Sequence, residues 1–229
     1  MGGAGGRRKG RACDPFRFDR SLLAGNAGGS RGGDLRLAGA DEAGRGSLAG
    51  PLVAAAVVLD YSAAPFRALA GLTDSKLLTP GARELLHLGI LRSATRVSWV
   101  ARSPSTIDRA GLHRCNLEAL ACALESLRGE YALAVVDAYD LQRPELRTYS
   151  VIDGDYKSAA VAAASVVAKV VRDRLMRAMS PLYPEYGFDE HVGYGTDRHR
   201  EALRRLGPCV LHRTSFQGVG TPQLELWEE

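Results

Sequence analysis

Residues 35–58 read LRLAGADEAGRGSLAGPLVAAAVV, and this stretch sets the architecture expected for the chain. The apolar run from Leu35 to Ala40 predicts a strand that ends in two carboxylates, Asp41 and Glu42. Residues 51–58 are rich in Val, Ala and Leu, which predicts a buried strand that runs back beside the first.

A loop with two glycines, Gly44-Arg45-Gly46, joins these two expected strands. Carboxylates at the end of a buried strand are partly desolvated, and in that position they bind divalent cations. Glycines beside them allow backbone amides to approach a ligand closely. The stretch therefore predicts a metal-carboxylate site next to a backbone contact for a polar ligand.

The composition indicates one substantial globular core. The chain has 229 residues, of which 45% are hydrophobic. It contains neither an apolar run of about 20 residues that could span a bilayer nor the apolar region of a secretory signal, so we expect a cytoplasmic protein. The cysteines form no Cys-x-x-Cys pair and stand at no zinc spacing with histidines, which favours reduced thiols and no zinc site. They are Cys13, Cys115, Cys122 and Cys209.

The first 33 residues are rich in Gly, Arg and Ala, and we expect them to be a mostly disordered extension. Residues 1–36 hold eight basic residues and three aspartates in a chain whose net charge is only +4, so the overall charge does not by itself indicate nucleic-acid binding. A solubilising extension is the simpler interpretation, and attraction to phosphate backbones is the alternative. A short helix containing Phe16, Phe18, Leu22 and Leu23 could pack on the body.

The rest of the chain predicts alternating strands and helices. Strands are expected over residues 96–102, 131–136 and 148–152. Helices are expected from Thr79-Pro80 to about Leu91, from the capping-box-like Ser105-x-x-Asp108, along the stripe Leu117, Leu120, Leu124 and Leu127, over residues 158–179, and from Thr196 to Gly207. The fold class is therefore α/β with a mixed sheet. We place the folded domain at 34–229, with a core at about 34–180 and a helical C-terminal part at about 181–229.

Three of these expected strands end in acidic residues, namely Asp41-Glu42, Asp137 and Asp155. Strand ends of one α/β sheet meet at a shared edge, where four carboxylates would repel each other unless cations compensate. Mg²⁺ or Mn²⁺ suits such oxygen ligands, and two ions about 3.5–4 Å apart could promote phosphodiester hydrolysis, one activating water and the other stabilising the leaving oxygen. A single aspartate at a strand end is more often a turn or helix cap, and Asp155 could simply cap the long helix. The set of three favours catalysis.

The segments Gly39–Gly46 and Ala49–Val53 resemble the signature of ribonuclease HII, the type-2 ribonuclease H family. Further matching segments occur in the same order along about residues 37–217. They are residues 74–76, 107–116, 154–158, 162–170, 172–176, 186–188, 191–196 and 212–216. The resemblance implies a ribonuclease H-like mixed sheet flanked by helices, with a small C-terminal helical subdomain.

The resemblance also implies an endoribonuclease. It would hydrolyse the RNA strand of RNA/DNA hybrids and cleave 5′ of ribonucleotides embedded in DNA, leaving 3′-hydroxyl and 5′-phosphate, and we expect it to be a monomer. The implied ligands of Mg²⁺ or Mn²⁺ are Asp41, Glu42, Asp137 and Asp155. The implied substrate contacts are Gly44, Arg45, Gly46, Lys76, Ser158, Lys169 and Tyr194. Contact with the 2′-hydroxyl suits this role, because that group distinguishes RNA from DNA.

Each of these side chains also has a simpler interpretation. Lys76 could be a solvated surface lysine, Lys169 a lysine on a helix face, and Tyr194 an exposed loop tyrosine. Two further proteins remain possible, a ribonuclease HIII-like nuclease and a catalytically silent hybrid-binding protein, although the latter is expected to lack an acid and all four are present.

Three positions depart from the family pattern. Leu77 stands where a second lysine is usual, Ala138 where glycine is usual, and Asp153 where lysine is common. Asp153 therefore competes with Asp155 as the fourth ligand, and the Gly-Asp pair favours Asp155. Adjacent strand residues point to opposite faces, so we expect the strand to end at Asp41-Glu42 or Glu42 to ligate also through its backbone carbonyl.

Overall fold

A mixed five-stranded sheet forms the centre of the protein. The computed structural model describes residues 14–26, 34–63, 65–72, 75 and 78–220. The strands are β1 (Arg36–Ala43), β2 (Leu52–Asp60), β3 (Arg96–Arg102), β4 (Leu133–Asp137) and β5 (Thr148–Val151), in the order β3-β2-β1-β4-β5. Strand β2 pairs antiparallel with β1 and β3, and β4 pairs parallel with β1 and β5. The expected α/β fold with a mixed sheet is confirmed.

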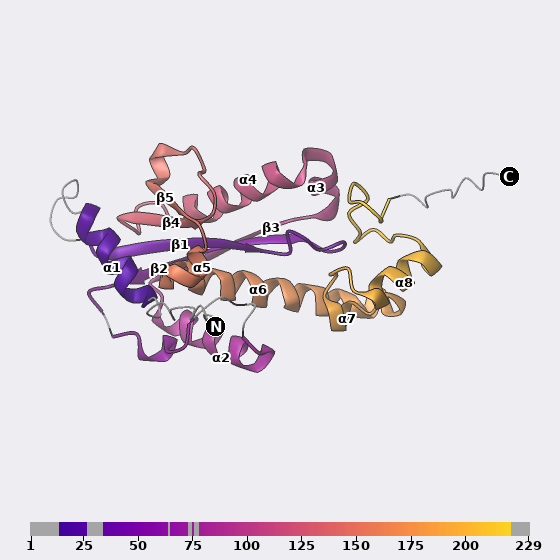
Figure 1. The fold of residues 1–229 in the computed structure, drawn as a ribbon, viewed down its shortest axis with the longest axis horizontal. Coiled ribbons are helices and arrows are strands. Elements are labelled where there is room, and N and C mark those ends of the chain that lie inside the picture. Colours follow the sequence, from indigo (N-terminus) through magenta and orange to yellow (C-terminus); the bar gives the residue numbers. More distant parts are fainter. Residues whose placement is uncertain (1–13, 27–33, 64, 73–74, 76–77, 221–229) are drawn as a thin grey trace, which may run out of the picture.

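Helices cover both faces of the sheet, and α7 and α8 lie beyond one of its ends (Figure 1). They are α1 (Pro15–Asn26), α2 (Pro80–Ser93), α3 (Pro104–Ala110), α4 (Leu112–Glu125), α5 (Gly154–Lys157), α6 (Ala159–Met179), α7 (Phe188–His191) and α8 (Asp197–Leu206). Short 3-10 turns occupy Arg67–Leu69, Pro144–Leu146, Ser180–Leu182 and Pro184–Tyr186. Among the helices of the described residues, none combines the length and apolar character that a bilayer span requires.

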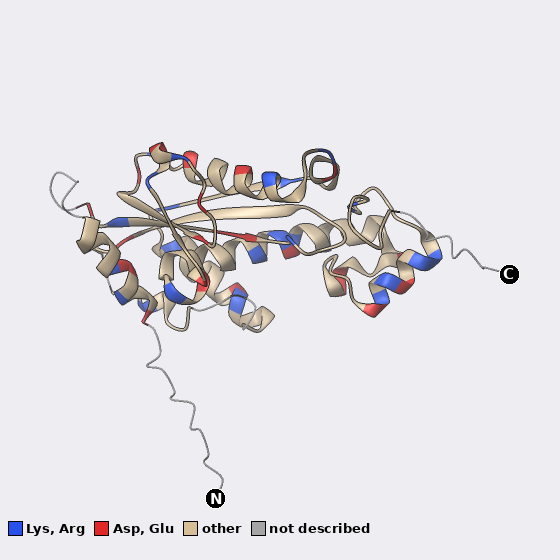
Figure 2. Cartoon of the chain, turned by 45° about the horizontal axis from the view of Figure 1, so that its top comes forward, with Lys and Arg blue, Asp and Glu red and all other residues tan. Residues whose placement is uncertain are grey.

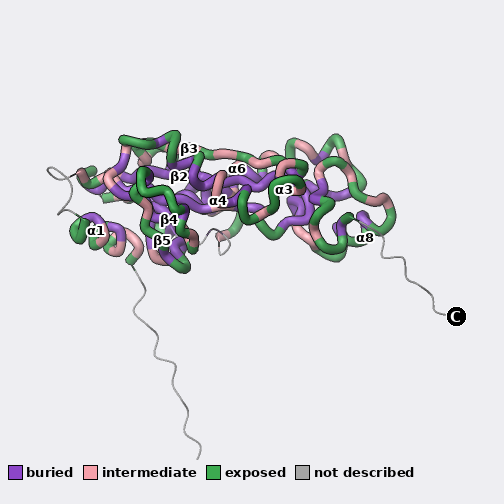
Figure 3. Tube along the Cα trace, turned by 90° about the horizontal axis from the view of Figure 1, so that it is seen from above, coloured by how far each residue is buried: buried purple, intermediate pink, exposed green. Residues whose placement is uncertain are grey.

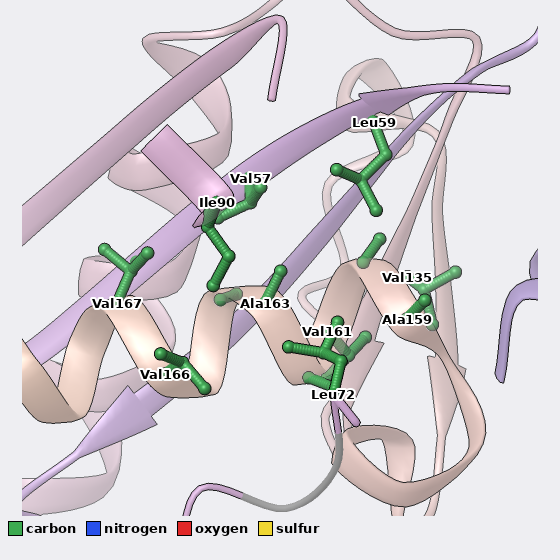
Figure 4. Packing of buried hydrophobic residues seen from close by; sticks show 14 of the residues in the cluster. Val57, Leu59, Leu72, Ile90, Val135, Ala159, Val161, Ala163, Val166 and Val167 are labelled. Atoms are coloured by element: carbon green, nitrogen blue, oxygen red, sulfur yellow. The ribbon is translucent and has the colours of Figure 1, made fainter. Parts of the chain in front are cut away.

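The alternation of side chains divides the core into two layers. Along β2, Val53, Val57 and Leu59 join the cluster that contains α6 and α2, whereas Ala54 and Val58 join the cluster that contains α4. Figure 3 shows the central strands and the first half of α6 buried, and Figure 4 shows the packing of β2 against α6 and α2. Both faces of the sheet are therefore covered, as the continuous apolar run of β2 indicated.

Helix α6 lies unusually close to β1 because both carry small residues at the contact. The first ten residues of α6 are all Ala, Val or Ser, and all are buried. A Cβ atom added to Gly39 of β1 would stand only 2.0 Å from the carbonyl carbon of Ala160. The strand and the helix thus need glycine at residue 39, and this close approach brings the acidic end of β1 next to α6.

Two local details differ from the expectations. Of the two alternatives for the acidic pair, a strand end at Asp41-Glu42 is wrong, because both residues remain paired with Ala55 and Ala54 of β2 and β1 continues to Ala43. Ligation through the backbone carbonyl of Glu42 stays a prediction. Helix α3 begins earlier than the Ser105 motif suggested. Its N-cap is Ser103, whose hydroxyl accepts a hydrogen bond from the amide of Thr106, and a proline follows at the first helical position.

Within the first 33 residues, for which the sequence predicts a mostly disordered extension, the described residues 14–26 contain helix α1. This agrees with the short helix that Phe16, Phe18, Leu22 and Leu23 suggested. The fully buried Asp19 accepts hydrogen bonds from the Tyr61 hydroxyl and from the Ala160 amide, 3.0 Å away, at the first turn of α6. Burial raises the pKa of Asp19 to about 6 although these hydrogen bonds act in the opposite direction.

We therefore predict that Asp19→Asn removes a pH-dependent part of the stability. The pKa of Asp19 is higher in the folded than in the unfolded chain, so its protonated form stabilises the fold at low pH, and this contribution is lost as pH rises from 3.8 to about 6. Over that interval, the free energy of unfolding of the wild type should fall by up to about 3 kcal/mol relative to Asp19→Asn. Urea titrations at several pH values measure this, and parallel curves for the two proteins would contradict it.

Candidate active site

Asp41 and Asp137 lie on neighbouring strands at the same end of the sheet. The parallel pairing of β1 with β4 stops at Ala40 opposite Val136, so each aspartate is the next residue along its strand. Side chains point alternately to the two faces along each strand, and Leu37 of β1 and Val135 of β4 pack towards α6. Asp41 and Asp137 lie an even number of residues further along and therefore point to the same face. The structure therefore brings together two acids that are 96 positions apart in the sequence.

Asp155 reaches the same end of the sheet through the short helix α5. The amide of Gly154 donates a hydrogen bond of 2.6 Å to Oδ1 of Asp137, and Asp155 follows directly, with 8% of its surface exposed. The competing Asp153 has a left-handed backbone, a side chain that is 73% exposed, and an ion pair with Lys157 at 4.0 Å. Burial beside Asp137 thus distinguishes Asp155 from Asp153.

The pKa of Asp41 is well above its usual range. Burial is the main cause, and the charges of Glu42 and Asp137 contribute in the same direction. A hydrogen bond from Ser165 of α6 and one of 2.7 Å from the Glu42 amide act in the opposite direction. The site is thus a desolvated cluster of carboxylates that repel each other, and a bound cation would relieve this repulsion.

Glu42 points to the opposite face of β1, because it alternates with Asp41 and follows Ala38 and Ala40, which pack towards α4. Burial and the negative charge of Glu42 raise the pKa of Tyr139, which packs against that same layer. The two acids of the pair therefore reach the strand end from opposite faces. As the side chains stand, no three His, Cys, Asp or Glu residues in the described part of the chain could hold one metal ion together.

The Gly44-Arg45-Gly46 loop rests on two fully buried arginines. Arg172 of α6 donates hydrogen bonds to Ser47 Oγ and to the carbonyl oxygens of residues 49, 51 and 192, at 2.7–3.0 Å. Arg213 donates to the carbonyl oxygens of Arg45 and Gly50 at 2.9–3.1 Å. Burial, together with the charge of Arg172, lowers the pKa of Arg213 to about 9. The sequence motifs included both arginines, but their hydrogen-bonding partners lie too far away in the chain to be predicted.

Lys169 and Tyr194, expected to contact substrate, lie beside each other. The Nζ atom of Lys169 is 5.0 Å from the centre of the Tyr194 ring and 2.6 Å from Oδ1 of Asp173. The guanidinium carbon of Arg172 is 5.1 Å from the same ring. The charged residues of α6 all lie in its second half, towards the C-terminal part (Figure 2). Tyr194 is therefore packed against this charged half of α6.

The other expected contacts have different surroundings. Arg45 is exposed, with its guanidinium carbon 5.5 Å from the centre of the Tyr139 ring. Ser158 is fully buried and caps α6 by accepting a hydrogen bond of 3.3 Å from the Val161 amide, which favours a structural role. Lys76 lies outside the described residues. Ser75, which is described, has its Oγ 2.9 Å from the Oγ of Ser165, the serine that donates a hydrogen bond to Asp41.

Comparison with known proteins agrees with this arrangement. The sequence model described as "Ribonuclease HII" matches residues 38–219, which include all four acids, the glycine loop and Tyr194. The chain belongs to the ribonuclease HII family. It is an endoribonuclease that cleaves RNA in RNA/DNA hybrids.

Relatives and solved structures place the chain within this family. It is 51% identical to ribonuclease HII of Azorhizobium caulinodans over 93% of this chain and 78% of the relative. It is 47% identical to the Xanthobacter autotrophicus enzyme over 85% and 76%. The crystal structure of ribonuclease H2 from Pyrococcus horikoshii is similar with a TM-score of 0.69 and 29% identity, covering 80% of this chain and 95% of the other.

Two further solved structures extend the comparison. The ribonuclease HII in the Archaeoglobus fulgidus complex with PCNA has a TM-score of 0.67 and 31% identity, covering 80% of this chain and 96% of the other. The structure of Bst ribonuclease HIII in complex with Mn²⁺ has a TM-score of 0.65, covering 96% and 76%, but only 19% identity, so it shows a common fold.

The two glycines of the ribonuclease HII loop should respond differently to substitution. Gly44 has φ +86°, and an added Cβ would stand 1.8 Å from Nε of Arg172, whereas a Cβ on Gly46 meets nothing within 4 Å. We predict that Gly44→Ala lowers the free energy of unfolding by about 2 kcal/mol or more, and that Gly46→Ala changes it by less than about 0.5 kcal/mol. Thermal melts of both variants test this. Equal shifts would show that Arg172 does not constrain the loop.

Proposed function

We propose that this enzyme cleaves on the 5′ side of single ribonucleotides embedded in duplex DNA, as well as within longer hybrids, and leaves 3′-hydroxyl and 5′-phosphate ends. The observation that carries the proposal is the burial of Asp41 beside Asp137, with Asp155 one residue beyond the amide that binds Asp137. Desolvated carboxylates without a nucleophilic Ser or Cys suit hydrolysis by an activated water.

Asp41, Glu42, Asp137 and Asp155 would hold two divalent cations, Mg²⁺ or Mn²⁺. All are oxygen donors, and the pKa of Asp41 is raised first by burial and then by the charges of Glu42 and Asp137, which bound cations would offset. The related fold of Bst ribonuclease HIII, solved with Mn²⁺, supports such a site. When bound, such cations activate the attacking water and offset charge on the phosphodiester. In the described part of the chain these side chains form no single ligand group as they stand, and we expect them to rearrange when cations bind.

The Gly44-Arg45-Gly46 loop and Tyr194 would recognise the ribonucleotide. The two elements belong to one bonded assembly, because the amides of Leu48 and Ala49 both donate to the carbonyl of Gly193, at 2.9 and 3.2 Å. Backbone groups held in this way can distinguish a 2′-hydroxyl from hydrogen without moving. Lys169 and Lys76 would contact phosphates. We further propose that the enzyme acts as a monomer in the cytoplasm, where its cysteines stay reduced.

A duplex with one embedded ribonucleotide tests the proposal. With Mg²⁺ or Mn²⁺ we expect a single cut 5′ of the ribonucleotide, and with EDTA none, because the acids alone cannot activate water. The measurement is denaturing electrophoresis of end-labelled strands, in which a polymerase must be able to extend the upstream product. An all-DNA duplex of the same sequence is the control. Cleavage in EDTA, or equal cleavage of that control, would reject the proposal, and binding without any cleavage would indicate a silent hybrid-binding protein.

Asp137→Asn should abolish turnover while substrate binding is retained. Asparagine keeps the oxygen that accepts the Gly154 amide but loses the negative charge that a cation requires. We expect kcat to fall by at least about 1000-fold, which corresponds to about 4 kcal/mol in the barrier, and the Kd for hybrid to change little. Single-turnover assays and fluorescence anisotropy measure the two quantities. Retained turnover would remove Asp137 from the site.

Asp155→Asn and Asp153→Asn form a matched pair that assigns the fourth acid. Both changes remove one negative charge, two residues apart, but only Asp155 is buried beside Asp137. We expect Asp155→Asn to reduce turnover by at least about 100-fold and Asp153→Asn by less than about threefold. Single-turnover rates at saturating Mg²⁺ decide between them, and the reverse order would make Asp153 the ligand.

A further inference from the structure

Three buried histidines form a cluster in the C-terminal part, outside the group of four acids. They are His191 at the end of α7, His199 in α8 and His212 in the following segment, with at most 8% of their surface exposed. The rings of His191 and His199 stack with centroids 4.3 Å apart, and Nε2 of His199 lies 3.0 Å from Nε2 of His212. A contact between two ring nitrogens requires that one donates and the other accepts, so both rings can be neutral and two N–H groups cannot face each other.

Backbone groups determine which nitrogen of His212 carries the proton. The amide of Cys209 donates to Nδ1 of His212 at 2.9 Å, so Nδ1 is an acceptor and the proton is on Nε2. The Cys209 carbonyl also lies 3.3 Å from Nδ1, but that contact is longer, and an amide hydrogen would not point at a protonated nitrogen. His212 therefore donates from Nε2 to Nε2 of His199.

The proton of His199 must then be on Nδ1, which donates to the carbonyl oxygen of Tyr194 at 2.9 Å. Hydrogen bonds thus run in one direction from the Cys209 amide through two neutral imidazoles to Tyr194. Burial lowers the pKa of both His199 and His212 to about 4, and no carboxylate is among the causes. The charged groups that act on His199 are His191 and Arg200, and those that act on His212 are His199 and His191. The thiol of Cys209 also faces His212, with Sγ 3.2 Å from Nδ1. Both rings are therefore neutral near pH 7.

The two ends of this chain of hydrogen bonds belong to the two elements proposed to recognise the ribonucleotide. His212 forms a β-bridge with Ala49, and the amide of Arg213 donates to the carbonyl of Leu48 at 2.9 Å, so this end is attached to the glycine loop. The other end holds the backbone of Tyr194, whose ring packs against Lys169. The histidine pair therefore links the position of the tyrosine to that of the loop.

We propose that His199 and His212 are positioning residues, which hold Tyr194 relative to the Gly44-Arg45-Gly46 loop and so determine how well the enzyme recognises a ribonucleotide. The inference rests on the proposed role of Tyr194 at the substrate. His199 acts through Tyr194 and touches no reacting atom.

Substituting His199 by asparagine or by glutamine separates the contributions of its two hydrogen bonds, one to Tyr194 and one from His212. An asparagine amide reproduces the Nδ1 donor and keeps the bond to Tyr194, whereas a glutamine carbonyl reproduces the Nε2 acceptor and keeps only the bond from His212. Both variants lose an imidazole and one buried hydrogen bond, so their melting temperatures should fall by similar amounts. Single-turnover cleavage of the embedded-ribonucleotide duplex should fall about tenfold for His199→Gln, the value of one hydrogen bond, and less than about threefold for His199→Asn.

A double-mutant cycle with Tyr194→Ala shows whether the effect passes through the tyrosine. If it does, His199→Gln adds nothing to the loss caused by Tyr194→Ala. Equal rates for the Asn and Gln variants, additive losses in the cycle, or no loss from Tyr194→Ala would overturn the inference. Failure of the proposed function would look different. The wild type would then cleave continuous RNA/DNA hybrid but not the duplex with one embedded ribonucleotide. In that case the single-turnover rates of the variants would be compared on the continuous hybrid.

The wild-type protein offers a test that does not depend on any variant. Nitrogen-15 NMR of the imidazole rings distinguishes Nδ1–H from Nε2–H tautomers. We expect His199 in the Nδ1–H form and His212 in the Nε2–H form between pH 6 and 8. The opposite tautomers, or a charged ring in that range, would overturn the inference even if the variants failed to fold.

Discussion

The close packing of α6 on β1 is the constraint on which the rest of the structure depends. It is possible because Gly39 has no side chain and because the first half of α6 has only small ones. The approach buries the end of β1 and brings Ser165 into hydrogen-bonding contact with Asp41. A bulkier residue at the contact would separate the two elements, and the carboxylates would then be more exposed to water.

The electrostatics of the site follow from this burial. Asp41 is deprived of water and lies near two other carboxylates, so its charged form is unstable without a positive partner. The hydrogen bonds of the two buried arginines go to carbonyl oxygens and to Ser47 rather than to Asp41. They hold the glycine loop instead.

The C-terminal part attaches to this core both through apolar contacts, such as Ala49 and Met176 with Phe188 and Val192, and through hydrogen bonds between distant segments. Arg172 joins α6 to the segment after α7, and Asp108 of α3 accepts hydrogen bonds from the amides and hydroxyls of Thr214 and Ser215. These directional bonds fix orientation better than apolar contact does, because each requires a particular distance and angle. That property suits a part of the molecule whose task is to place a tyrosine beside a loop.

The sequence by itself determined most of the strands and helices along the chain, the mixed sheet, and the position of Asp41 and Asp137 at the same end of that sheet. These depend on local periodicity, caps and the covalent position of these acids at strand ends, and the alternation of β1 already required Asp41 and Glu42 to face opposite ways. Only the tertiary structure decided that β1 continues through the acids, because the partner strand β2 keeps pairing with it. It alone decided that Ser158 and Asp19 secure the start of α6, and that His199 faces His212. The reason is that pairing, burial and tautomer depend on partners brought from far along the chain, which no local pattern encodes.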